Sequence, residues 1–409
     1  DDKEETWMEK EKKEAGMQKK NFKDGIRLSP LGMGAMRLPQ TEEGFAKPID
    51  EPRAQEIIDY CIQHGVNYFD TAYIYHGGQS ETFLGKALKK YPRENYFVAD
   101  KFNVQADPDY AAQFAEQLRR LQMERIDFYL LHGVTDRLIS DYLDHGAPEY
   151  FFEQKRLGRI RYLGFSFHGS PDALRQLLKR YPWDFVQIQL NYYDWFHGTA
   201  REQYEILRKQ GIPVMVMEPA HGGMLASLPA EGVNLLHSAR PDSSCASWAF
   251  RFLRSLPGIA VILSGMSALE QAEDNLRTFS EAPSLSEEEL ALIRKVSDLL
   301  HGLYAVPCTG CRYCCADCPQ GLDIPFLLSA YNEYKTGGEK ALSSWRLDRL
   351  GALPEEKRPS ACIGCGQCTK HCPQGLAVPA FMKEMASFSQ PTSPAPGRYA
   401  HTSPATPEA

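Results

Sequence analysis

Short apolar segments recur from Leu31 to about residue 280, and each is followed by a segment with the 3.6-residue spacing of an amphipathic helix. The apolar segments are mostly continuous runs, which are typical of strands buried on both faces. They lie at 31–38, 67–72, 96–102, 127–132, 162–168, 185–191, 214–218 and 258–264. The helical segments lie at 53–64, 80–89, 110–121, 151–158, 171–179, 201–209 and 246–254, with a last one from Ser267.

Eight alternating strands and helices predict an α/β protein with a parallel sheet. A closed (β/α)8 TIM barrel, which typically takes about 250 residues, fits this segment better than an open sheet. The alternative is a Rossmann-like sheet, but no G-x-G-x-x-G sequence follows any predicted strand. We expect the barrel at residues 24–285, after a charged and partly disordered N-terminal extension at 1–23.

Two cysteine runs with the same C-x2-C-x2-C-x3-C-P spacing follow the barrel. Such runs bind [4Fe–4S] clusters, and the fourth cysteine of each run ligates the other cluster of a pair. The sequence therefore predicts two clusters with crossed ligands. The expected ligand sets are Cys308, Cys311, Cys314 with Cys372, and Cys362, Cys365, Cys368 with Cys318.

Other roles for these cysteines fit less well. Zinc sites usually take two C-x2-C pairs, and disulfides need a secreted context. Cys61, Cys245 and Cys315 remain outside the pattern and are expected to be small buried side chains. Helical periodicity at 326–334 and 339–350, between the runs, predicts a mainly helical ferredoxin-like domain at 286–386, before a disordered tail at 387–409.

The overall composition excludes some classes of partner. The 409 residues are 43% hydrophobic and 24% charged, as in ordinary globular proteins. A net charge of -7 without a basic cluster disfavours nucleic acid. No apolar run approaches the roughly 18 residues of a membrane span. Oxygen-labile thiolate clusters favour a reducing, cytoplasmic setting, and we expect an anaerobic organism.

Four polar residues follow consecutive predicted strands, where the active sites of such barrels lie. They are Asp70, Tyr75, Lys101 and His132. Lys101 ends an apolar strand and needs a buried carboxylate, for which Asp70 is the natural partner. A lysine cation beside the Tyr75 phenol lowers its pKa, which suits a general acid for a carbonyl oxygen.

The barrel resembles the aldo/keto reductase superfamily over roughly residues 24–282. The matching motifs are Phe69-Asp-Thr-Ala with Tyr75, Gly78-Gln-Ser-Glu-Thr-Phe-Leu-Gly85, Lys101, His132, Gly164-Phe-Ser166, Gln187, Val216-Met-Glu-Pro219 with Gly222-Gly223, and Gly265 with Gln271 and Asn275. The whole chain is similar to the bacterial branch that carries a C-terminal [4Fe–4S] dicluster domain. The resemblance implies the catalytic tetrad Asp70, Tyr75, Lys101 and His132.

The resemblance also implies nicotinamide contacts. Ser166 and Gln187 correspond to the family's carboxamide contacts, and Met217 stands where the family often stacks a tyrosine. His168 stands near the position where an asparagine commonly follows the serine. Gly265 and Gln271, with Asn275 nearby, stand where members that prefer NADPH place cations for its phosphate. Without a cation the phosphate loses charge-assisted hydrogen bonds, so NADH or NADPH remains open.

The two predicted cofactor types move different numbers of electrons, since a nicotinamide transfers a hydride and each cluster transfers one electron. Three interpretations follow. The barrel reduces a small carbonyl, or oxidises an alcohol, while the clusters serve electron transfer or dock ferredoxin or another electron-transfer protein. Alternatively, the clusters feed a flavin or substrate at the barrel, although no flavin fingerprint is present. Thirdly, the chain is a non-enzymatic redox sensor. Tyr142, Trp195, Phe196 and His221, in predicted loops, suggest an aromatic-lined pocket.

Overall fold

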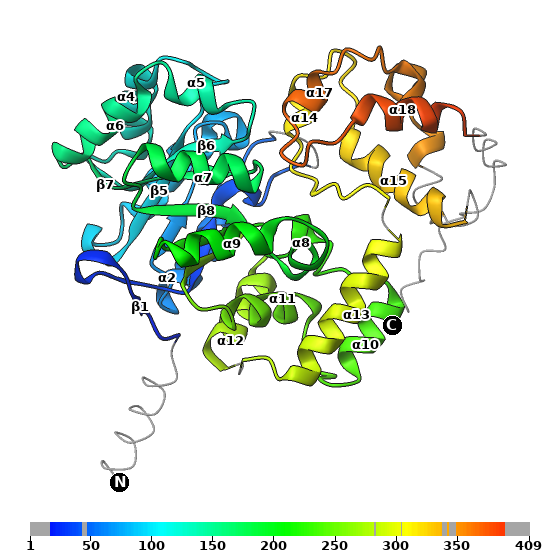
Figure 1. Ribbon diagram of the computed structural model, residues 1–409, viewed down its shortest axis with the longest axis horizontal. Helices are drawn as coiled ribbons and strands as arrows, with labels where there is room; N and C mark the ends of the chain where they lie inside the picture. The colour runs from blue at the N-terminus through cyan, green and yellow to red at the C-terminus, as the bar shows by residue number, and fades with distance from the viewer. Residues whose placement is uncertain are drawn as a thin grey trace, which may run out of the picture. The chain divides into compact units, whose positions relative to one another are not determined.

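A computed structural model describes residues 17–42, 47–281, 284–303, 305–337, 342 and 349–388. Most of the predicted N-terminal extension, most of the second insertion helix at 339–350 and most of the predicted tail lie outside these residues. The chain forms two compact units that divide between Gly302 and Leu303 (Figure 1), and each is described by itself.

The first unit is a closed barrel of eight parallel strands, which confirms the predicted fold class. Strand neighbours follow chain order, and β10 pairs with β3 to close the ring. The strands are β3 (Leu31–Gly34), β4 (Tyr68–Asp70), β5 (Phe97–Phe102), β6 (Ile126–Val134), β7 (Ile160–Phe167), β8 (Phe185–Gln189), β9 (Val214–Met217) and β10 (Ile259–Ser264).

A helix follows each strand on the outside of the barrel (Figure 1). Several begin at residues that satisfy exposed backbone N–H groups, such as Asp109 before α4 and Ser170 before α7. None of the described helices is long and apolar enough to cross a membrane. The helices are α2 (Glu51–Gln63), α3 (Gln79–Leu88), α4 (Tyr110–Leu121), α6 (Ala147–Arg156), α7 (Pro171–Arg180), α9 (Ala200–Lys209), α11 (Cys245–Arg254) and α12 (Leu269–Glu281), with α5 (Ile139–Leu143), α8 (Tyr192–His197) and α10 (Ala230–His237) in the connections.

The first strand is shorter than its apolar sequence predicts. We expected a strand over 31–38, but β3 ends at Gly34 and residues Ala35–Arg37 form a 3-10 turn. The apolar residues after Gly34 are buried by this turn rather than by pairing with strands, so hydrophobicity alone does not locate the end of the strand. Within β3, a side chain at Gly32 would come within 2.7 Å of Val261 and 2.8 Å of Leu263, so the tight barrel interior excludes larger residues there.

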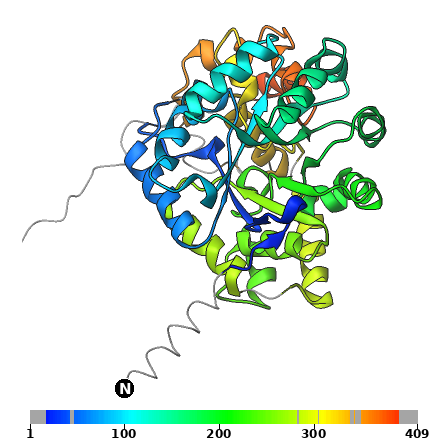
Figure 2. The same ribbon diagram turned by 90° about the vertical axis from the view of Figure 1, so that its left-hand side faces the viewer.

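A two-stranded hairpin closes the floor of the barrel. Strands β1 (Lys20–Asn21) and β2 (Arg27–Leu28) pair antiparallel, and the hairpin lies across one end of the strands (Figure 2). Phe22 packs edge-on against Tyr162 at 5.2 Å between ring centroids, in a cluster that fills the barrel interior. The opposite end, where the strands have their carboxyl termini, stays available for a site.

Helix α13 (Glu287–Leu303) packs with the barrel. Ser286 and Glu289 form a reciprocal cap at its start, with Glu289 N donating to the Ser286 hydroxyl and Ser286 N donating to the Glu289 carboxylate. The same carboxylate pairs with the buried Arg251 of α11 at 2.7 Å. Although we assigned this helix to the cluster domain from its sequence, all of it except the last residue, Leu303, lies within the first compact unit. The domain boundaries themselves stay a prediction.

The second unit repeats one short pattern. Helix α14 (Tyr313–Ala316) carries Cys314, the third cysteine of the first run, and α15 (Ile324–Gly337) follows the Pro-Gln-Gly-Leu sequence after that run. Helices α17 (Gln367–Lys370) and α18 (Val378–Ala386) occupy the same positions after the second run. Buried apolar residues from both halves, including Leu322, Leu327, Val378 and Met382, form a common core. The described part of this unit is helical, as predicted.

A buried pair of carboxyl groups lies behind β5, on the side that faces the helices. Asp100 and Glu81 are both fully buried. Glu81 accepts hydrogen bonds from Gln117 at 3.0 Å and from Arg120 at 2.8 Å. Burial raises the pKa of Asp100 well above its usual value, and the neighbouring Glu81 carboxylate raises it further. Asp100 therefore favours its protonated form in the folded chain.

This raised pKa predicts that Asp100→Asn stabilises the protein at neutral pH. Below a pH of about 4 the Asp100 carboxyl is protonated in both the folded and the unfolded chain, so its burial does not reduce the free energy of unfolding through ionisation. As the pH rises, the unfolded chain releases the proton and the wild-type fold loses stability, whereas asparagine does not ionise. We expect a higher melting temperature for the variant at pH 7, by about 2–4 °C for each kcal/mol gained. Thermal denaturation at pH 7 and pH 4 measures this difference.

The matched control is Asp172→Asn, because the Asp172 side chain is 86% exposed. It should leave the melting temperature nearly unchanged at both pH values. An Asp100→Asn variant that is less stable than wild type at pH 7 would contradict the assignment of a protonated Asp100.

Candidate functional site

A buried ion pair lies at the carboxyl ends of β4 and β5. Lys101 Nζ is 2.6 Å from Asp70 Oδ1, and it also donates to the carbonyl of Thr71 at 2.6 Å. Lys101 is fully buried and Asp70 is 3% exposed. Burial raises the pKa of Asp70, and the Lys101 cation acts in the opposite direction. The pairing expected from the sequence is thus present, and neither charge is left alone in the interior.

Tyr75 lies above this pair. It begins a short 3-10 turn, Tyr75–Gly78, in which His76 and Gly77 take left-handed backbone angles with φ of 51° and 64°. This tight turn keeps the Tyr75 side chain buried at the barrel, and Lys101 Nζ is 5.0 Å from the centroid of its ring. A cation at this distance from a phenol stabilises negative charge on the phenol oxygen.

His132 lies beside Tyr75, with 5.8 Å between the ring centroids and an angle of 81° between the rings. Burial lowers the pKa of His132 well below its usual value, and the charge of Lys101 lowers it further. The ring is therefore neutral near pH 7, with one N–H to donate and one nitrogen to accept. The Nδ1 atom of His132 lies 3.5 Å from the side-chain nitrogen Nδ2 of Asn103.

The predicted tetrad of Asp70, Tyr75, Lys101 and His132 is therefore brought together at one end of the barrel. Tyr142 was predicted to line an aromatic pocket, but it packs in the interior instead. It is fully buried, and its hydroxyl donates to the main-chain carbonyl of His132. Trp195 is also engaged in packing, with Tyr204 at 5.5 Å and Phe252 at 5.6 Å between ring centroids.

The predicted carboxamide contacts lie on β7 and β8. The Ser166 hydroxyl accepts a hydrogen bond from Gly133 N at 2.7 Å, and Gln187 Nε2 donates to the Met217 sulfur at 3.6 Å. Gln187 Oε1 is buried without a hydrogen-bond donor among the described residues. A carboxamide –NH2 group would satisfy this oxygen, so these residues fit a nicotinamide.

The segment after β10, which includes the start of α12, carries the predicted contacts to the distal part of the cofactor. Asn275 donates to the Ser264 hydroxyl at 3.0 Å, and Gln271 Oε1 accepts from Ser267 N at 2.8 Å. The aliphatic part of Arg37 packs against Gly265, where a side chain would meet its Cβ at 3.1 Å. Arg37 could not be predicted from the sequence, because the residue lies at the other end of the barrel sequence and only ring closure brings it next to Gly265.

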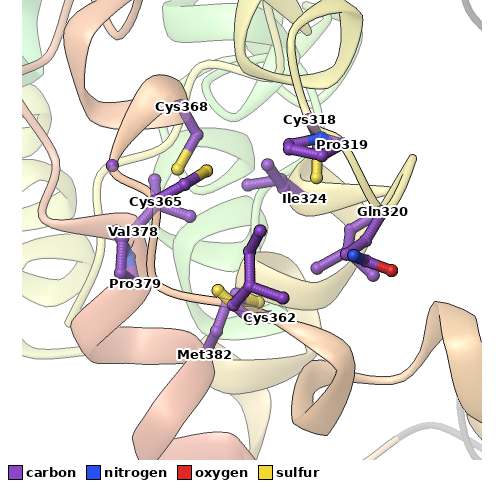
Figure 3. Close-up of a pocket in the computed structure, with 13 residues that line it drawn as sticks. Cys318, Pro319, Gln320, Ile324, Cys362, Cys365, Cys368, Val378, Pro379 and Met382 are labelled. Atoms are coloured by element: carbon purple, nitrogen blue, oxygen red, sulfur yellow. The ribbon is translucent and has the colours of Figure 1, made fainter.

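The second unit contains a partly open cavity lined by four cysteines, with about 340 Å³ of space between its atoms when open solvent is included. Three come from the second run and one is the last cysteine of the first run, as Figure 3 shows. Apolar residues complete the lining, including Ile324, Val378 and Met382. The cysteines are Cys318, Cys362, Cys365 and Cys368.

A matching cavity, with about 310 Å³ of space counted in the same way, is lined by the other predicted set, Cys308, Cys311, Cys314 and Cys372. None of the eleven cysteines, all of which lie in described residues, forms a disulfide. Cys315 packs against the common core and lines neither cavity, whereas its neighbour Cys314 lines the second. Thiolates and an apolar lining suit iron–sulfur clusters, so the crossed cysteine sets fit the predicted cofactors.

Comparison with known proteins identifies both parts of the chain. The family model of the aldo/keto reductase family matches residues 30–298, and that of the 4Fe-4S dicluster domain matches residues 307–377. The first match contains the tetrad and the predicted nicotinamide contacts. The second contains all eight cysteines that line the two cavities.

Solved structures and curated proteins match the barrel. An aldo-keto reductase of Bacillus halodurans, AKR11C1 in its holo form, is 30% identical with a TM-score of 0.58, covering 68% of this chain and 96% of that one. The uncharacterized oxidoreductase YqkF of Bacillus subtilis is 26% identical over 65% of this chain and 92% of its own length. The L-galactose dehydrogenase of Arabidopsis thaliana is 27% identical over 66% of this chain and 89% of its own.

The two cavities predict different results for two adjacent cysteines. A chain with both clusters holds about eight iron atoms, and Cys315→Ala should keep them because Cys315 lines neither cavity. Cys314→Ala should lose one cluster and about half of the iron. Anaerobic iron and sulfide analysis of the purified variants measures this difference. Loss of iron in Cys315→Ala with full retention in Cys314→Ala would reverse the ligand assignment.

Proposed function

We propose that this chain, which belongs to the aldo/keto reductase family, reduces a small carbonyl or oxidises an alcohol with a nicotinamide cofactor. The observation that carries the proposal is the buried Lys101–Asp70 ion pair beneath the Tyr75 phenol, beside a neutral His132. This arrangement holds a proton donor next to a cation, in a position protected from water. Such a group suits general acid catalysis on a developing alkoxide.

Each member of the tetrad has a distinct proposed role. Tyr75 donates its proton to the substrate oxygen in the reduction and takes it back in the oxidation. Lys101 stabilises the phenolate that Tyr75 becomes, and Asp70 holds the lysine in place. Neutral His132 donates a hydrogen bond to the same substrate oxygen and orients it. When bound, the nicotinamide supplies or accepts the hydride on carbon.

The remaining barrel contacts orient the cofactor in this proposal. Ser166 and Gln187 hold the carboxamide, and the flexible Met217 side chain lies where the nicotinamide ring packs. Gly265, Gln271 and Asn275 contact the distal part of the cofactor. We propose weak discrimination between NADH and NADPH, because no lysine or arginine stands at positions 265 or 271.

The clusters have a separate role in the proposal. They are bound by the two crossed cysteine sets and exchange single electrons with ferredoxin or another electron-transfer protein. The observation that favours this role is the dicluster domain match, together with two cavities whose linings the eight cysteines complete. A flavin at the barrel would be needed to couple these electrons to a hydride, and this coupled reductase is the alternative function.

The proposed role of Tyr75 predicts a specific kinetic effect. Tyr75→Phe removes the proton donor but leaves the cofactor contacts on β7, β8 and β10 intact. We expect kcat for carbonyl reduction to fall by about 10²–10⁴-fold, while nicotinamide binding changes no more than a few-fold. Steady-state kinetics and fluorescence titration with NADH and NADPH measure the two effects.

Tyr73→Phe is the matched control, since Tyr73 lies in the same loop but its ring faces the Arg120 guanidinium at 4.4 Å. Its turnover should stay close to that of the wild type. Wild-type turnover in Tyr75→Phe would exclude the proposed acid and favour a non-enzymatic sensor.

The separate role of the clusters predicts that nicotinamide alone does not reduce them. A hydride donor needs a flavin or a similar mediator to pass electrons one at a time. Anaerobic addition of NADH or NADPH to the whole protein should leave the visible absorbance of the clusters unchanged, whereas dithionite should bleach it. Rapid bleaching by NADH would instead support the flavin-coupled reductase.

A further inference from the structure

The two halves of the cluster unit share a backbone conformation but differ in one charged residue. Between the second and third cysteines, both runs place a residue in the left-handed region. These residues are Arg312, with φ 67° and ψ 6°, and Gly366, with φ 73° and ψ 2°. Glycine adopts this conformation freely, but a residue with a side chain pays on the order of 1–2 kcal/mol. An arginine is therefore held where the fold would accept a glycine.

An ion pair found in the first half holds this arginine. Arg312 Nη2 lies 3.0 Å from Asp323 Oδ1, and Arg349 Nη2 lies 3.0 Å from the other oxygen of the same carboxylate. The counterpart of Asp323 after the second run is Ala377, since both follow a Gly-Leu pair. Two arginines share one carboxylate, so this group of three side chains carries a net positive charge.

The charge lies next to one of the two cavities. Among the described residues, Arg312 is the charged side chain that lines the cavity of Cys308, Cys311, Cys314 and Cys372. The lining of the other cavity contains no charged residue, and Gly366 is part of it. Lys357 is not part of the lining of this cavity, but it donates to the main-chain carbonyl of Gln320, which is, at 2.6 Å.

Arg312 also offers a hydrogen-bond donor. Its Nε atom is buried and has no acceptor among the residues that the structure describes. A buried donor of this kind requires a partner. The sulfurs of a cluster in the adjacent cavity are suitable acceptors, and hydrogen bonds to sulfur are one of the terms that set cluster reduction potentials.

We propose that Arg312 makes the two clusters unequal, so that the cluster of Cys308, Cys311, Cys314 and Cys372 has the higher reduction potential and takes the first electron. The proposal rests on the crossed ligand sets of the proposed function. A single electron from an external donor such as ferredoxin adds one negative charge to the cluster, with no bond made or broken and no proton moved. A nearby cation and N–H donor stabilise that added charge.

The test is an anaerobic redox titration of the full chain with dithionite and mediators, followed by electron paramagnetic resonance. Wild type should show two midpoint potentials. Arg312→Gly, which also relieves the backbone strain, should lower the higher one by at least a tenfold change in the equilibrium, or about 59 mV for one electron. Arg312→Gln should act in the same way, while Arg312→Lys should retain most of the potential because it keeps the charge.

The reciprocal variant Gly366→Arg is the matched control. Apart from its chain neighbours, no heavy atom lies within 4 Å of the position that a Cβ at residue 366 would take. The new side chain therefore has space beside the cavity of Cys318, Cys362, Cys365 and Cys368. It should raise the lower potential and leave the higher one in place. Two full clusters with potentials that do not move in Arg312→Gly, or a shift of the lower potential in that variant, would overturn the role of Arg312. If the purified wild-type protein contained only enough iron for one cluster per chain, the two ligand sets themselves would be overturned.

Discussion

The barrel site depends on one buried ion pair. Lys101 and Asp70 have no water to solvate their charges, so each needs the other, and Thr71 takes a further hydrogen bond from the lysine. The pair joins two adjacent strands at the end of the barrel where the connecting loops meet. Its positive member lies near the Tyr75 ring, and its charge adds to the burial that keeps the His132 ring neutral. Burial and one charge together thus prepare two neighbouring side chains for opposite tasks.

Much of this arrangement was predictable from the sequence, for physical reasons. Parallel strands that are buried on both faces leave continuous apolar runs, and the polar residues that end them must meet at one rim, as Asp70 and Lys101 do. The cysteine spacing likewise predicts that three cysteines of each run share a cavity with the fourth cysteine of the other run, because the short intervals within a run limit which thiols can meet. Two contacts left no such signal and are visible only in the folded chain. Ring closure places Arg37 beside Gly265, and α5 folds back after β6 so that the Tyr142 hydroxyl donates to the His132 carbonyl.

The chain combines two domains whose families transfer different numbers of electrons. The barrel family transfers hydrides, and a dicluster domain holds one-electron centres. Gln187 Oε1 has no hydrogen-bond donor among the described residues, and eight cysteines line the two cavities, so each unit has residues that fit its proposed cofactor. A hydride carries two electrons and a cluster takes one, so the proposed chemistries could be coupled only through a mediator or a partner.

The crossed lining of the two cavities constrains how the protein is made. The cavity of Cys308, Cys311 and Cys314 is completed by Cys372, which leaves the ribosome only after the whole helical insertion has been synthesised. The other cavity needs Cys318, so it cannot close without the earlier run either. With the proposed ligand sets, neither half could take up its cluster alone during translation. Cluster insertion would then be a late event in biogenesis, and a chain truncated between the two runs would complete neither lining.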